Sequence, residues 1–179
     1  MRWTLHCLFL SMALAGCAGR ASTFLKSGGE TAPPLPSAVA ESPRQEAERL
    51  WAQRADPDST RAMLAAFFRA AAADPENRAY LARCSRAVYF VAHYIEGDPA
   101  KKDSLFTLGL QTAERSLGLH PAFRKIFEET GDEKRAVELV GEEDIDAVYW
   151  YAANLGRWAA SKNLLVRLGA KGKLEKFNG

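Results

Sequence analysis

Regular helical spacing of apolar residues, interrupted by prolines, is the feature that most limits how this chain can fold. From Pro43 onward, apolar side chains recur every three or four residues, and no segment shows the alternating pattern of a β-strand. The interruptions fall at Asp56-Pro57, Asp74-Pro75, Gly97-Asp98-Pro99 and His120-Pro121. Because proline ends one helix or begins the next, we predict a single all-α domain over residues 43–179.

These interruptions predict a series of helices joined by short loops. The first begins at Pro43, and the second follows an N-cap at Asp58 or Ser59. A third covers residues 77–96, a fourth covers 105–119, and a last strongly helical segment covers 145–162. The third is apolar on two faces, one of which includes Tyr94, so we expect it to lie between two neighbouring helices.

The helix pairs resemble tetratricopeptide repeats, in which two helices fill about 34 residues. The residues that match the later part of that pattern are Leu50, Phe67, Ala70 and Pro75. The next pair ends in a comparable SLGLHP but is longer, so the repeats are degenerate. Because the loops are short and each pair ends in proline, we favour a solenoid of helix hairpins over a closed bundle.

The N-terminal residues predict export and a lipid anchor. Arg2 precedes an apolar run from Leu5 to Ala15, which is shorter than the roughly 20 residues of a membrane-spanning helix. The run ends in Leu-Ala-Gly-Cys and resembles the lipobox of bacterial lipoproteins, so we interpret residues 1–16 as a signal peptide and Cys17 as the lipidation site. An ordinary signal peptide cleaved near Ala13 to Ala15 is the alternative. In a host that has an outer membrane, Ala18 favours residence there, facing the periplasm, because it is not the aspartate that retains lipoproteins at the inner membrane.

Residues 17–42 contain several glycines and prolines and few large apolar side chains, so we predict a lipidated flexible tether there. Cys84 is then the one free thiol of the mature chain, and the core must hold the fold without a disulfide. The formal net charge of +2 argues against a nucleic-acid partner. The charge is nevertheless uneven, with an acidic stretch over 128–146 and a basic tail over 157–179. These segments are either solvated surface or a docking surface for a protein.

The segment AVYWYAANLGRWAAS, residues 147–161, concentrates aromatic side chains on one predicted helix. Two of its faces consist of Val148, Tyr151, Leu155 and Trp158, and of Trp150, Asn154, Arg157 and Ser161. We expect core packing for the first face. The second mixes an aromatic ring, an amide and a guanidinium, which favours a partly hydrated cavity because buried polar groups need partners. Gly156 costs a helix about 1 kcal/mol relative to alanine, so we expect another helix to approach closely there.

Taken with the acidic stretch, the degenerate repeats and the lipobox, AVYWYAANLGRWA resembles the T-component family of TRAP (tripartite ATP-independent periplasmic) transporters. The resemblance implies a helical-repeat fold with an internal apolar channel, a periplasmic substrate-binding protein as partner, a hydrophobic small-molecule ligand and homo-oligomers. It makes Tyr149, Trp150, Asn154 and Trp158 candidate channel or ligand-binding residues, to which the helix face adds Arg157. Members of this family continue with further helices, whereas this chain stops at GKLEKFNG, where Leu174 and Phe177 resemble the start of another helix. We therefore expect a truncated chain and an incomplete repeat domain.

The sequence contains no nucleophile elbow, P-loop or HExxH motif, so we predict no enzyme, cofactor or metal site. Cys84 and His93 are nine residues apart, which places them on opposite faces of one helix. His120 precedes Pro121, where a histidine commonly caps the carbonyls of a helix end. The expected function is that of a non-catalytic lipoprotein accessory to a TRAP-type transporter. A protein scaffold in bacterial envelope or outer-membrane assembly is the alternative.

Overall fold

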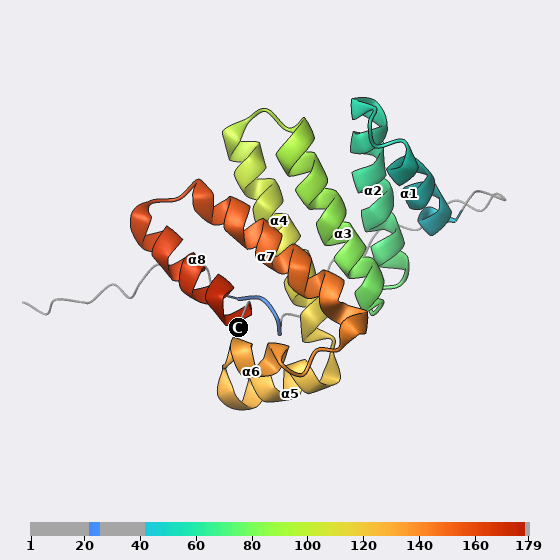
Figure 1. The fold of residues 1–179 in the computed structure, drawn as a ribbon. Coiled ribbons are helices and arrows are strands. Elements are labelled where there is room, and N and C mark those ends of the chain that lie inside the picture. Colours follow the sequence, from blue (N-terminus) through green and yellow to red (C-terminus); the bar gives the residue numbers. More distant parts are fainter. Residues whose placement is uncertain (1–21, 26–41, 178–179) are drawn as a thin grey trace, which may run out of the picture.

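The computed structural model describes residues 22–25 and 42–177, with side chains up to Glu175. This part of the chain is helical and contains no strand (Figure 1). Its elements are α1 (Pro43–Ala52), α2 (Pro57–Ala73), α3 (Arg78–Phe90), the π turn η1 (Val91–Ile95), α4 (Pro99–Gly118), α5 (Pro121–Thr130), α6 (Glu133–Val137), the 3-10 turn η2 (Glu142–Asp144), α7 (Ile145–Ala160) and α8 (Leu164–Phe177). The all-α fold of helix hairpins is confirmed, while its repeat character stays a prediction.

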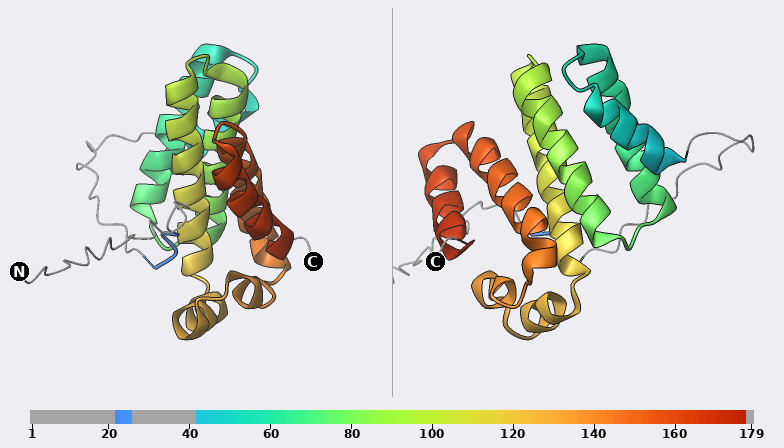
Figure 2. Two further views of the ribbon diagram at one scale, coloured as in Figure 1. Left: turned by 90° about the vertical axis from the view of Figure 1, so that its left-hand side faces the viewer. Right: turned by 45° about the vertical axis from the view of Figure 1, so that its right-hand side comes forward.

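Three antiparallel hairpins, α1–α2, α3–α4 and α7–α8, lie side by side (Figures 1 and 2). The helix α4 packs against α3 and α7, and α7 also contacts α3 and α8. The short helices α5 and α6 cover the end of the molecule where α4 ends and α7 begins (Figure 1). Two hydrophobic clusters result, one within α1, α2 and α3, and another centred on α4, α5 and α7. The third predicted helix therefore lies between two neighbours, as its two apolar faces indicated.

Among the described helices, none combines the length and the apolar character that crossing a membrane requires.

Side-chain caps decide where most of the helices begin. Ser42 and Gln45 form a capping box at the start of α1. At α2 the cap is Asp56, whose carboxylate accepts a hydrogen bond from the Ser59 backbone N at 2.9 Å. The predicted cap at Asp58 or Ser59 is therefore wrong. The reason is Pro57, which has no N–H to satisfy and is well suited to the first helical position.

The end of the third predicted helix is a π turn, which the sequence did not reveal. The Glu96 backbone N donates to the Val91 carbonyl, five residues earlier, at 2.9 Å. The wider turn shifts the following side chains around the helix axis. Tyr94, which the apolar pattern assigned to a buried seam, is consequently 64% exposed.

Two further helix boundaries differ from expectation. The fourth helix begins at Pro99, well before residue 105, because the Asp98 side chain accepts hydrogen bonds from the Ala100 and Lys101 backbone N atoms. The last helix, α8, begins at Leu164, just after Asn163, whose side-chain oxygen accepts from the Val166 backbone N at 3.1 Å. Leu174 therefore lies near the end of α8 and does not start a further helix.

Residues 22–25 are docked into the helical domain, unlike the flexible tether predicted over 17–42. Phe24 is only 2% exposed, and Thr23 forms hydrogen bonds to Glu114 of α4. A single phenylalanine among small and polar residues shows no periodicity, so the sequence contains no sign of this contact. The predicted signal peptide, Cys17 and residues 26–41 of the tether lie outside the described residues.

The helix α7 approaches α4 closely at Gly109. A Cβ atom added to Gly109 would lie 2.2 Å from the Asn154 side-chain oxygen. At Gly156, an added Cβ would lie 3.9 Å from Leu174 Cδ1, which is an ordinary van der Waals contact. The expectation that Gly156 permits close helix packing is therefore wrong, because α8 leaves room for a methyl group there.

These two glycines predict opposite effects of the same substitution. Gly156→Ala should raise the free energy of unfolding by about 0.5–1 kcal/mol through better helix propensity. Gly109→Ala should lower it by about 1–3 kcal/mol, because the methyl group collides with Asn154. Urea denaturation followed by circular dichroism measures both values. A Gly156→Ala variant less stable than Gly109→Ala would contradict the conclusion that the close helix contact lies at Gly109 and not at Gly156.

Candidate functional site

The five candidate residues of the aromatic segment lie in three different places around α7. Trp150 and Arg157 lie toward α3 and η1, and Tyr149 is exposed next to Trp150. Asn154 lies in the core, and Trp158 packs against the cluster centred on α4, α5 and α7. The separation follows from the turn of about 100° per residue in an α-helix, which rotates Trp158 away from Arg157. The five residues therefore do not form a single surface, because Asn154 is buried and Trp158 packs into the hydrophobic cluster.

Asn154 connects three helices through a buried polar junction. Its side-chain Nδ2 donates to Ser85 Oγ of α3 at 3.1 Å and to the Trp150 carbonyl at 2.8 Å. Ser85 Oγ in turn donates to the Gly109 carbonyl of α4 at 2.8 Å. Asn154 and Ser85 are both fully buried. Asn154 thus supports the site from within the core and is not accessible to a ligand.

An aromatic surface lies beside this junction, on the side of α7 that faces α3 and η1. We define it as the side chains of Tyr89, His93, Tyr94, Tyr149, Trp150 and Arg157. Trp150 contacts Tyr89 and Tyr149, with ring centroids 5.5 and 4.8 Å apart. The rings of His93 and Tyr94 continue the surface along η1, with centroids 4.5 Å apart. Tyr94 and Tyr149 are more than half exposed, which is unusual for large aromatic side chains of a folded domain.

Arg157 joins the two helices of the aromatic surface. Its Nε donates to Tyr89 Oη at 3.3 Å, and its Nη2 lies 3.3 Å from His93 Nε2. A guanidinium can only donate, so Nε2 of His93 must be the unprotonated, accepting nitrogen of the ring. Burial lowers the pKa of His93, and the positive charges of Arg157 and Lys102 lower it further. The aromatic surface therefore contains a neutral imidazole next to a fixed positive charge.

The π turn contributes directly to this arrangement, since His93 and Tyr94 both lie in η1. The sequence pattern indicated the α7 half of the surface but gave no sign that Tyr89, His93 and Tyr94 form its other half. A break in the regular helical spacing near Glu96 was the one available signal, and it does not distinguish a π turn from an ordinary helix end.

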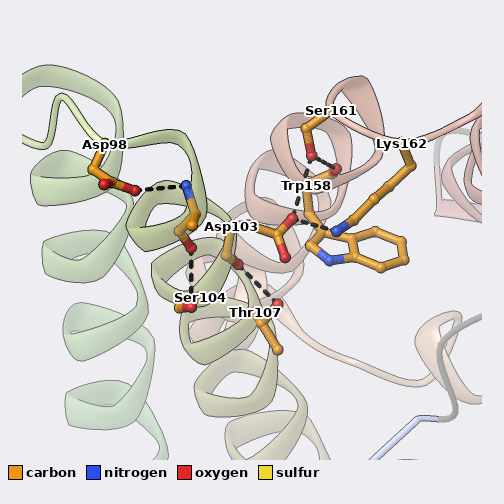
Figure 3. Close-up of polar contacts among 8 residues, drawn as sticks. Asp98, Asp103, Ser104, Thr107, Trp158, Ser161 and Lys162 are labelled. Atoms are coloured by element: carbon orange, nitrogen blue, oxygen red, sulfur yellow. Dashed lines mark hydrogen bonds and ion pairs between the residues drawn. The ribbon is translucent and has the colours of Figure 1, made fainter.

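Trp158 belongs to a different corner, formed by α4 and the α7–α8 loop (Figure 3). Its ring packs against the cluster centred on α4, α5 and α7, and the Lys162 ammonium lies 5.1 Å from its centroid. Asp103 of α4 pairs with Lys162 and accepts a hydrogen bond from Ser161 Oγ at 3.3 Å. These contacts hold the tryptophan in a structural position at the start of the α7–α8 loop.

The acidic stretch and the basic tail meet at one described ion pair. Lys173 Nζ of α8 lies 2.9 Å from Glu133 Oε1 of α6, and Glu133 is 7% exposed. This pair helps to fix α8 over α6. Most acidic residues of the stretch are exposed, including Glu142 and Glu143. The opposite charges therefore contribute to packing at the Lys173–Glu133 pair, whereas Glu142 and Glu143 form solvated surface.

A cluster of His120, Glu143 and Asp144 brings three metal-binding side chains within 4.8 Å of one another. The Arg78 guanidinium lies 3.2 Å from Asp144 Oδ2, where it opposes a cation. His120 Nδ1 accepts a hydrogen bond from the Phe123 backbone N at 3.2 Å, so Nε2 carries the proton of the neutral ring and has no free lone pair. The donor set does not fit a metal ion. His120 is the N-cap of α5, which corrects the expectation that it caps carbonyls.

Cys84 is fully buried in α3, and its Sγ donates to the Phe67 carbonyl at 3.3 Å. Burial raises the pKa of its thiol to about 12. The thiol is therefore protonated at neutral pH and inaccessible, which makes it a poor nucleophile. Its role in the described domain is packing between α2 and α3.

No protein-family model matches this chain, and comparison with curated proteins also finds no match.

The pairing of Arg157 with His93 predicts how His93 titrates. Its pKa should lie below the ordinary 6.5, so the unfolded chain binds this proton more readily than the folded one. Above about pH 6.5, His93 is neutral in both states and does not lower the free energy of unfolding. As the pH falls below that value, the unfolded chain takes up the proton first and the free energy of unfolding decreases. Replacing Arg157 by glutamine should move the His93 pKa upward, as measured by NMR titration of the imidazole protons.

Lys101→Gln is the matched control, since Lys101 is an exposed cation of α4 that does not perturb His93. A His93 titration midpoint that stays unchanged or falls in Arg157→Gln would contradict the pairing. Assignment of the His93 signals follows from their loss in His93→Gln.

Proposed function

We propose that the chain is a non-catalytic lipoprotein of the bacterial envelope that serves as an accessory component of a TRAP-type transporter. In this proposal, Cys17 carries the lipid that holds the protein at the membrane, with the domain facing the periplasm. The aromatic surface docks the periplasmic substrate-binding protein and can shield an apolar solute during transfer. No cofactor takes part.

The aromatic surface is the observation that carries this proposal. Half of it, Tyr149, Trp150 and Arg157, comes from the segment that resembles the T-component family. The other half comes from α3 and the π turn, so two helices present one surface. The buried Asn154 junction supports it from below. A surface held in place before binding loses little conformational entropy when a partner docks.

The chemistry of this surface suits a protein partner. Exposed tyrosine and tryptophan provide large contact area with few rotatable bonds and a polar group that can hydrogen bond. Arg157 adds a fixed charge at the centre, within reach of Tyr89 and His93. Trp, Tyr and Arg are the residues that most often dominate binding energy at protein interfaces. The surface therefore has the composition expected of an interface core.

Replacing Trp150 by alanine tests the proposal. We expect binding of the substrate-binding protein to weaken by at least about 2 kcal/mol, roughly 30-fold in Kd. The loss of folding stability should be smaller, because Trp150 is only half-buried. The measurements are titration calorimetry of binding and urea denaturation of the variant. The partner is first identified by purifying the full-length acylated protein from its native envelope in mild detergent.

Trp51→Ala is the matched control, because Trp51 is also half-buried but packs against Phe67 and Phe90 in the cluster of α1, α2 and α3. It should leave binding unchanged. Equal losses of binding and stability in Trp150→Ala would assign this residue to core packing. Recovery of envelope-assembly factors alone, from cells that express the binding protein, would favour the scaffold alternative.

A further inference from the structure

The segment Ser22–Leu25 occupies a defined place in the helical domain. The Phe24 ring lies among Phe123 and Phe127 of α5 and Tyr151 of α7, with ring centroids 4.9, 5.1 and 5.8 Å away. Phe24 and Phe123 are both almost fully buried. Three aromatic contacts around one side chain form a specific slot, in which a smaller residue would leave a void.

A polar contact fixes the neighbouring residue of the same segment. The Thr23 backbone N donates to Glu114 Oε2 at 3.0 Å, and the Thr23 hydroxyl donates to the same oxygen. Glu114 lies on α4 and is fully buried. Burying a carboxylate is unfavourable unless hydrogen bonds compensate for the lost water. The segment thus satisfies a polar group that the helical domain carries in its interior.

The backbone of α4 is shaped to admit this segment. A Cβ atom added to Gly118 would lie 1.9 Å from the Phe24 carbonyl oxygen, so no larger residue fits there while the segment is docked. Gly118 is in the last turn of α4 and is buried. Three features of the helical domain thus contact residues 23 and 24: the aromatic slot around Phe24, the buried carboxylate of Glu114, and Gly118. They come from separate positions of the chain.

We propose that Ser22–Leu25 is an intramolecular clamp that holds the α5 end of the domain against the lipid surface in which Cys17 is anchored. This proposal rests on the lipid anchoring in the proposed function. Only five residue steps separate Cys17 from Ser22. At about 3.5 Å per residue, an extended chain of that length reaches about 18 Å. A free tether from Cys17 to Pro43 would instead reach about 90 Å.

The clamp also decides which end of the domain faces the membrane. Phe24 contacts α5, which lies at the end of the molecule where α4 finishes (Figure 1). The turn between α1 and α2 lies at the opposite end of the hairpins (Figure 2). The docked segment therefore brings α5 close to the lipid and directs the start of α2 away from it, into the periplasm.

Fluorescence energy transfer to acceptor lipids tests this orientation in the full-length acylated protein. Donor dyes are attached to Lys125→Cys on α5 or to Asp58→Cys on α2, both of which are exposed positions. The buried Cys84 does not compete for the dye. In phosphatidylethanolamine–phosphatidylglycerol vesicles with an acceptor on the headgroup, we expect transfer from α5 to exceed transfer from α2 severalfold. Phe24→Ala should abolish this difference, whereas the conservative Phe24→Leu should retain most of it.

Two further measurements separate the clamp from the lipid anchor. Hydrogen exchange of the Thr23 amide should be slow in the full chain and fast in Phe24→Ala. Gly118→Ala, which leaves the N-terminal arm unchanged, should release the same amide. Circular dichroism verifies that these variants remain helical. Mass spectrometry of the N-terminal peptide determines whether Cys17 is acylated.

Fast exchange of the Thr23 amide, or equal transfer from both dyes in acylated protein, would overturn the clamp. Absence of an acyl group on Cys17 would overturn the lipid anchoring and the orientation that depends on it. Slow Thr23 exchange in that case would still support the docking of Ser22–Leu25. The two failures are therefore distinguishable.

Discussion

The hydrogen-bonded contact of Asn154 with Ser85, next to Gly109, sets the geometry on which the rest of the structure depends. It lies where α3, α4 and α7 meet, and all three side-chain positions are buried. A polar junction inside a core favours one register of the helices, because a shift of α7 would break the hydrogen bonds made by the Asn154 amide nitrogen and the Ser85 hydroxyl. It therefore defines how α7 lies on the α3–α4 hairpin, and with it the position of Trp150 relative to Tyr89.

The aromatic surface and the π turn follow from this arrangement. Once α7 is in register, Arg157 reaches Tyr89 and His93 on the facing helix. The π turn keeps His93 beside Arg157 while it directs Tyr94 outward. The proposed interface thus combines an internal support of buried polar groups with an outer layer of exposed rings. The first gives a fixed shape, and the second gives contact area for a partner.

Packing of the described domain also depends on residues that precede its first helix. Phe24 completes the hydrophobic cluster of α4, α5 and α7, and Thr23 compensates for burial of Glu114. The domain boundary at Pro43, which the helical pattern indicated, therefore omits Phe24, which belongs to the core, and Thr23, which forms hydrogen bonds to the buried Glu114. In the proposed clamp, the same contacts connect the fold to the membrane and orient the aromatic surface relative to it.

Local rules already present in the chain account for the helical part of the fold. Apolar periodicity and proline positions predicted the helices around Tyr80, Leu110 and Tyr151, because the 3.6-residue repeat is written directly into the side-chain order. The same periodicity placed Trp150 and Arg157 on one face of the helix around Tyr151, whereas Tyr149 was a candidate only through the family resemblance. Distant contacts decided what the pattern could not: the pairing of Arg157 with Tyr89 and His93, the role of Gly109, and the burial of Phe24. Each of these depends on contacts with atoms of a segment distant in the sequence, and those contacts form only when the chain folds.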